Sequence, residues 1–171
     1  MHLNFQNLVL LIVLTLIWGS SYILMKKAEE GFSPVEMACL RISISFLASL
    51  PFTIKALRHV PRNNWGTVFF IGLFGSGIPA FLFAFSISKS ESGLNGIINS
   101  LSPLWTLLIG YFLFGVLLTK QKVLGVITGF IGAAVLVLGK HGANFEIDVA
   151  YSMLPVMATF CYGVSSNLTK Q

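Results

Sequence analysis

Residues 93–118 read GLNGIINSLSPLWTLLIGYFLFGVLL and carry no charged side chain. A transmembrane helix needs about 20 predominantly apolar residues, so this stretch is long enough to cross a bilayer. With about 100° of rotation per residue, polar and small residues fall on one narrow face of such a helix, and Leu and Ile dominate the others. That face comprises Asn95, Asn99, Ser102, Thr106 and Gly110.

The polar face has no favourable place in lipid, where an amide without a hydrogen-bond partner is costly. We therefore expect it to face protein or a water-filled pathway. Pro103 lies in the middle of the stretch and lacks a backbone donor, which predicts a kink there. Asn95 and Asn99 would hydrogen-bond a polar substrate or ordered water, and Trp105 would supply apolar or stacking surface.

The composition of the whole chain predicts a polytopic membrane protein with an all-α fold. Of its 171 residues, 55% are hydrophobic and only 10% are charged, whereas soluble domains average about 25% charged. The net charge of +5 sits in short loops, which indicates membrane orientation and not nucleic-acid binding.

The apolar runs are too long for barrel strands, which have roughly 10 residues. We expect helices near residues 8–25, 37–54, 66–88, 94–118, 122–139 and 149–168.

The distribution of Lys and Arg predicts that the N-terminus is cytoplasmic, and the expected location is the inner or plasma membrane. The loops after the second and fourth spans carry Lys55, Arg58, Arg62, Lys120 and Lys122.

Two features of the first two spans suggest a substrate pathway. Trp18 lies deep for a residue of an interfacial aromatic belt, and it shares a helix face with Tyr22; Ser21 lies beside them. Arg41 is the only charge well inside a span, and intramembrane charges are functional candidates. The alternatives are a belt with a packing glycine for the first span, and snorkelling or pairing with Glu36 for Arg41.

The third and fifth spans are rich in glycine on one face, which lets helices approach closely. Pro79 permits a second kink in the third span, whose face suits either packing or a path lining. The fifth span has a GxxxG pattern that favours packing. The candidate packing residues are Gly72, Gly75, Gly125, Gly129 and Gly132.

The sixth span resembles the first. Thr159, Gly163 and Ser165 repeat the spacing of Thr15, Gly19 and Ser21. The second copy begins five spans after the first, an odd number, so it would enter the membrane from the opposite side. This predicts an inverted-topology repeat, an arrangement common in secondary transporters.

Enzymatic motifs are absent from this sequence. The three histidines lie in tails or loops, and no P-loop, zinc-ligand spacing or nucleophile elbow occurs. We expect no enzyme activity, no catalytic residue, no metal and no cofactor.

The chain resembles the EamA-type transporters of the drug/metabolite transporter superfamily. The resemblance rests on residues 18–22 (WGSSY), on Ser33-Pro34 followed by Arg41, on residues 93–103, and on the glycine-rich fifth span. Where family members often have Gly-Glu at the end of the fourth span, this chain has Gly115-Val116. The resemblance implies two five-helix repeats with substrate between them, of which residues 1–140 would form the first and 141–171 the start of the second.

The sequence therefore predicts a truncated protein: half of a ten-helix inverted-repeat permease that exports a small metabolite or amphipathic compound. Its expected partners are the lipid bilayer, the substrate, and either a second copy or the missing second repeat. A non-transporting fragment and a structural or regulatory membrane subunit are the alternatives. The pathway candidates are Trp18, Ser21, Tyr22, Arg41, Asn95, Asn99, Ser102 and Trp105.

Overall fold

The computed structural model describes residues 5–57, 59–141 and 149–170. This part of the chain is helical and contains no strand, which confirms the all-α fold class. Its helices are α1 (Phe5–Ala28), α2 (Pro34–Leu57), α3 (Trp65–Gly72), α4 (Ile78–Ile87), α5 (Ser92–Asn99), α6 (Ser102–Phe114), α7 (Lys120–His141) and α8 (Val149–Leu168). A 3₁₀ turn (Arg62–Asn64) precedes α3, and a π-helical segment, η2 (Leu73–Gly77), joins α3 to α4.

Four helical stretches in the described part of the chain are long and apolar enough to cross a membrane. They are Phe5–Ala28, Pro34–Leu57, Arg62–Ile87 and Ser92–Phe114. Together with the family described below, they indicate a multi-pass membrane protein. The fifth and sixth expected spans form α7 and α8, of 22 and 20 residues; that these two helices also cross the membrane stays a prediction.

The start of α2 is determined by local side-chain chemistry. Pro34 occupies the first helical position, where its missing N–H costs nothing. The carboxylate of Glu36 accepts hydrogen bonds from the backbone N–H and the hydroxyl of Ser33, both at 2.8 Å. This is a capping box, so Glu36 is engaged at the helix end and not with Arg41.

The expected helix over residues 94–118 is divided in two. Pro103 lacks the N–H that would bond to the carbonyl of Asn99, and the Ser102 hydroxyl donates to that carbonyl instead, at 2.7 Å. The helix is interrupted at Ser100 and Leu101, directly before α6. At the other end, Gly115 adopts a left-handed conformation with φ 63° and ends α6 at Phe114, before the expected residue 118.

The break interrupts the helix that carries the predicted polar face. Asn99 and Ser102 still meet across it, because the Ser102 hydroxyl donates to Oδ1 of Asn99 at 3.2 Å. Asn95 is fully buried and donates to the Ser90 hydroxyl at 2.7 Å. A regular period of 3.6 residues cannot be extended across the interruption.

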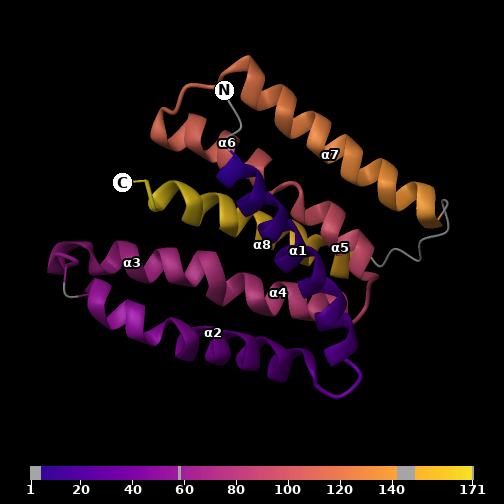
Figure 1. The fold of residues 1–171 in the computed structure, drawn as a ribbon, viewed down its shortest axis with the longest axis horizontal. Coiled ribbons are helices and arrows are strands. Elements are labelled where there is room, and N and C mark those ends of the chain that lie inside the picture. The colour runs from indigo at the N-terminus through magenta and orange to yellow at the C-terminus, as the bar shows by residue number, and fades with distance from the viewer. Residues whose placement is uncertain (1–4, 58, 142–148, 171) are drawn as a thin grey trace.

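Helix α8 lies between α4 and α6 and packs against both (Figure 1). Its contact with α6 is close because both helices present glycine there. A Cβ atom at Gly163 would lie 2.8 Å from Cβ of Trp105, and one at Gly110 would lie 2.8 Å from Oδ1 of Asn167. Asn167 also donates to the Thr106 carbonyl at 2.9 Å, which satisfies a buried amide between two helices.

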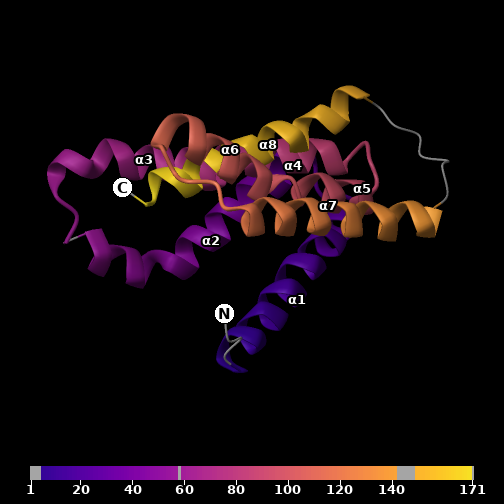
Figure 2. The same ribbon diagram turned by 90° about the horizontal axis from the view of Figure 1, so that it is seen from above.

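Helix α1 is packed much more lightly. It crosses the other helices near its C-terminal end, and Figure 2 shows its N-terminal part leaving the group of helices. The only side chain of α1 that is buried is Met25, which joins the apolar core made by the start of α2, by α4 and by α8. Most large apolar side chains of α1 are exposed, as expected for a helix that contacts lipid or another protein unit.

Candidate functional site

A cavity of about 1070 Å³ lies between α1, α2, α4, α6, α7 and α8. Small-molecule sites typically have volumes of roughly 300–1,000 Å³, so this space is large enough for a metabolite. The lining combines aromatic rings with hydroxyl and guanidinium groups that come from distant parts of the chain. Such a mixture holds the apolar and polar parts of an amphipathic ligand at the same time.

Five of the eight pathway candidates line this cavity: Trp18, Ser21, Tyr22, Arg41 and Ser102. Trp18 is 50% exposed on α1, and Ser21 and Tyr22 follow it toward the same space. Arg41 extends from α2, and Ser102 begins α6 at the break before Pro103. Because these residues come from three helices, only the tertiary structure brings them together.

The other three candidates lie outside the cavity lining. Asn95 is buried at the start of α5, and its Oδ1 atom has no hydrogen-bond partner. Asn99 sits at the helix break, where its carbonyl and side-chain oxygens both face the Ser102 hydroxyl. Trp105 packs edge-on against Phe160, with ring centroids 5.4 Å apart. Their part in transport stays a prediction.

The glycines expected to serve packing have different surroundings. Gly75 is closely approached, because a Cβ there would lie 2.6 Å from Oγ of Ser165. Gly125 and Gly129 line the cavity, and a Cβ added at either would have no heavy atom within 4 Å; the same holds for Gly72 and Gly132. In the described structure the glycine face of α7 is therefore not packed against another helix, and Gly125 and Gly129 border the open space of the cavity.

Pro79, where the sequence predicted a kink, lies in the first turn of α4. The π-helical segment Leu73–Gly77 comes directly before it. Ser165 donates to the Ile71 carbonyl at 3.0 Å, so α8 supplies a hydrogen bond where the backbone of this span departs from regular α-helix.

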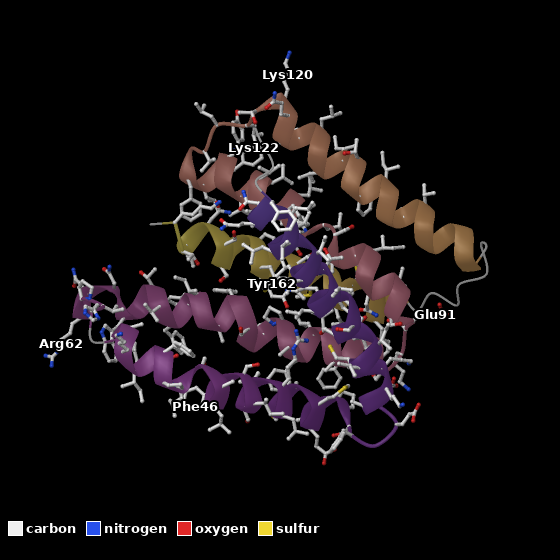
Figure 3. All side chains as sticks on the ribbon, in the orientation of Figure 1. Phe46, Arg62, Glu91, Lys120, Lys122 and Tyr162 are labelled. Atoms are coloured by element: carbon white, nitrogen blue, oxygen red, sulfur yellow. The ribbon has the colours of Figure 1, made fainter. Side chains whose placement is uncertain are left out.

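Several lining residues were not selected from the sequence as pathway residues. Tyr162 and Phe83 form a stacked pair with ring centroids 6.0 Å apart, and Tyr22 meets Phe83 edge-on at 5.9 Å. Tyr162 occupies the position in α8 that Trp18 has in α1. The internal repeat could therefore have identified Tyr162 as a lining residue. Figure 3 shows Tyr162 among the central helices. Lys122, at the start of α7, also lines the cavity. Its position before an apolar run had suggested only a role in orienting the chain across the membrane.

A second cavity of about 360 Å³ lies between α2 and the α3–η2–α4 segment. Arg41, Gly75 and Tyr162 line both cavities, which places them where the two spaces meet. The guanidinium of Arg41 donates to the sulfur of Met25 at 3.1 Å. Among the described residues, no carboxylate lies within ion-pair distance of Arg41.

The fold and the cavity define a class: a multi-pass helical membrane protein with a polar and aromatic cavity between its helices. Residues 6–138 match the EamA-like transporter family, and the chain belongs to that family. This confirms the resemblance found in the sequence. A family of transporters is also the class that the sequence favoured over enzymes.

Comparison with curated proteins gives a similar result. The chain is similar to an uncharacterized transporter of Archaeoglobus fulgidus, with 25% identity over 121 residues. The matched region covers 70% of this chain and 43% of that relative, so the chain corresponds to less than half of the relative's length. No solved structure matches the chain.

Proposed function

We propose that this chain is the first repeat of a secondary transporter that exports small metabolites or amphipathic compounds, and that the 1070 Å³ cavity is part of its substrate path. The observation that carries the proposal is the convergence of Trp18, Tyr22, Arg41 and Ser102 on one space from three helices. An exposed surface patch of scattered polar residues would not enclose a ligand in this way. Family membership supports transport as the activity.

The lining suits a substrate with both polar and apolar parts. Ser21, Ser102 and Thr106 place hydroxyl groups at the cavity, and each hydrogen bond to a bound ligand contributes about 1 kcal/mol. Trp18 and Tyr162 offer aromatic surface for an apolar part of the ligand. These contributions favour recognition of small amphipathic compounds over inorganic ions alone.

Transport would proceed by alternating access, in which one repeat rocks against another around a central site. The likeness of α8 to α1 supports an inverted second unit as the partner. That unit is either a second copy of this chain or a second repeat. The relative from Archaeoglobus fulgidus is long enough to contain such a repeat. In this arrangement the N-terminus lies in the cytoplasm and the protein resides in the inner or plasma membrane.

A matched pair of glycine substitutions on α7 tests the path. Gly129→Leu would fill the cavity without a backbone clash, whereas Gly132→Leu adds the same side chain on the same helix outside the lining. We expect Gly129→Leu to lower export at least about tenfold, the loss produced by about 1.4 kcal/mol, and Gly132→Leu to leave it near the wild-type rate.

The measurement is release of amino acids, organic acids and amphipathic dyes from preloaded membrane vesicles that contain the chain. Equal rates for the two variants at equal protein level would contradict the proposed path. Absence of export above that of empty vesicles for the whole panel would contradict transport by this chain.

A further inference from the structure

The charges that line the main cavity are all positive. Arg41 and Lys122 reach it, and none of its described lining residues is Asp or Glu. The remaining lining is made of hydroxyl, amide, aromatic, aliphatic and glycine residues. Two cations at one cavity attract anions and repel cations, and no carboxylate among the described lining residues offsets this field.

Arg41 lacks a charged partner among the described residues. Its nearest polar contact is the sulfur of Met25 at 3.1 Å, a weak and neutral acceptor. Glu36, five residues before Arg41 on α2, is held by Ser33 in the helix cap. A guanidinium inside a membrane span is costly unless a counter-charge pairs with it, and a bound carboxylate fits its planar fork with two parallel hydrogen bonds.

The two cations come from different helices. Lys122 is in the first turn of α7, and Arg41 is in α2, 16 residues before its end at Leu57. Both line the same cavity, so an anion inside it would meet a cation from each of two helices.

Aromatic rings stand beside Arg41. Tyr22, Phe83 and Tyr162 form a cluster in which the Phe83 ring contacts both tyrosine rings, at centroid distances of 5.9 and 6.0 Å. All three rings border the cavity that Arg41 enters. A flat apolar group attached to the bound anion would lie against these rings in offset or edge-on contact.

We propose that the cavity selects small organic anions with a flat apolar body. Arg41 binds the anionic group, the cluster of Tyr22, Phe83 and Tyr162 contacts the body, and Lys122 is the second cation along the path. This inference rests on the proposed function, because it names the substrate class of the same cavity.

Equilibrium binding to the purified full chain in detergent micelles tests the charge preference. The probes are benzoate, benzyl alcohol and benzylamine, which share a phenyl ring and differ in charge. We expect benzoate to bind at least about tenfold more tightly than either of the others, which corresponds to the strength of one charge-assisted interaction.

Substitutions then assign the effect to particular side chains. Arg41→Gln is expected to lower benzoate affinity about tenfold, and Arg41→Lys to restore part of it, since lysine keeps the charge but loses the planar fork. Lys122→Gln should weaken benzoate binding and reduce its dependence on salt. The matched control is Lys120→Gln, because Lys120 projects away from the helices and does not line the cavity (Figure 3); it should leave binding unchanged.

Three outcomes would overturn the inference. One is equal binding of benzylamine and benzoate. Another is unchanged benzoate affinity in a folded Arg41→Gln protein, with folding checked by circular dichroism and gel filtration. If Arg41→Gln does not fold, unchanged affinity in Arg41→Lys and Lys122→Gln would have the same meaning.

Binding and export separate this inference from the proposed function. Selective benzoate binding without export of any compound supports the anion site and contradicts transport by this chain. Export of neutral or cationic compounds without a preference for benzoate supports transport and contradicts the anion site.

Discussion

Helices α1 and α8 share a sequence pattern but differ in how they pack. Thr15 and Thr159 stand at the same place in the pattern, and each hydroxyl donates to a carbonyl of the preceding turn of its own helix, both at 2.8 Å. Gly19 and Gly163 follow four residues later in each helix. The pattern therefore produces similar local structure in both helices, although Thr15 donates to Leu11, four residues before it, and Thr159 to Val156, three residues before it.

The surroundings of the two patterns are different. A Cβ at Gly163 would meet Trp105 and Ile109 within 3.0 Å, whereas one at Gly19 would have no heavy atom within 4 Å. Thr159 is fully buried and Thr15 is exposed. The pattern gives a helix a small residue that allows close packing. Whether that packing occurs depends on the presence of a neighbouring helix.

The largest difference is expected from adding one methyl group at the two matched glycines. Gly163→Ala should destabilise the protein by about 1–3 kcal/mol, because the backbone of α6 must move away. Gly19→Ala should change stability by less than about 1 kcal/mol, in the stabilising direction, since alanine favours helix and meets no atom. The measurement is unfolding by sodium dodecyl sulfate in mixed micelles. Equal losses would show that α1 is packed as closely as α8.

A smaller effect is expected where α8 meets the π-helical segment. Gly75→Ala would displace the Ser165 hydroxyl from the Ile71 carbonyl and cost about 1 kcal/mol. In a Ser165→Ala background the new methyl would meet only Cβ of residue 165, at 3.4 Å, so that cost should nearly vanish. The matched substitution in α1, Ser21→Ala, loses only a 4.0 Å contact with Met25 sulfur and should be near neutral.

The double-mutant cycle uses the same unfolding measurement. A coupling energy near zero between positions 75 and 165 would contradict the packing described for α8.

A third difference is expected in how accessible positions 15 and 159 are to a labelling reagent. The substitutions used to measure it should leave stability nearly unchanged. In a background without Cys39 and Cys161, Thr15→Cys should react with N-ethylmaleimide at least about tenfold faster than Thr159→Cys, because access to the latter requires local opening. The experiment uses the chain in detergent and follows labelling by mass spectrometry. Protection of Thr15→Cys would mean that a second protein unit covers α1.

Comparing α5 and α6 shows which structural features a periodic sequence pattern can predict. The apolar composition of residues 93–118 correctly indicated helix, and Pro103 marked the place of irregular backbone. The helix predicted over residues 94–118 is not continuous, since the Ser102 hydroxyl donates to the Asn99 carbonyl at a break that a helical projection ignores. Glycine patterns were similarly ambiguous, because a glycine beside a neighbour and a glycine beside a cavity look alike in sequence.

Apolar runs of sufficient length determine by themselves that this chain is a helical membrane protein, because a backbone in lipid must satisfy its own hydrogen bonds. Local motifs also suffice to identify the EamA-like family. They singled out Trp18, Tyr22 and Arg41, which the structure places in the lining of the cavity. Only the tertiary structure decided which side chains meet. It placed Tyr162 and Lys122 at the cavity with Arg41. It also packed α8 much more closely than α1, because contacts between distant helices depend on the shapes of both helices and on their crossing angle, which no single helix encodes.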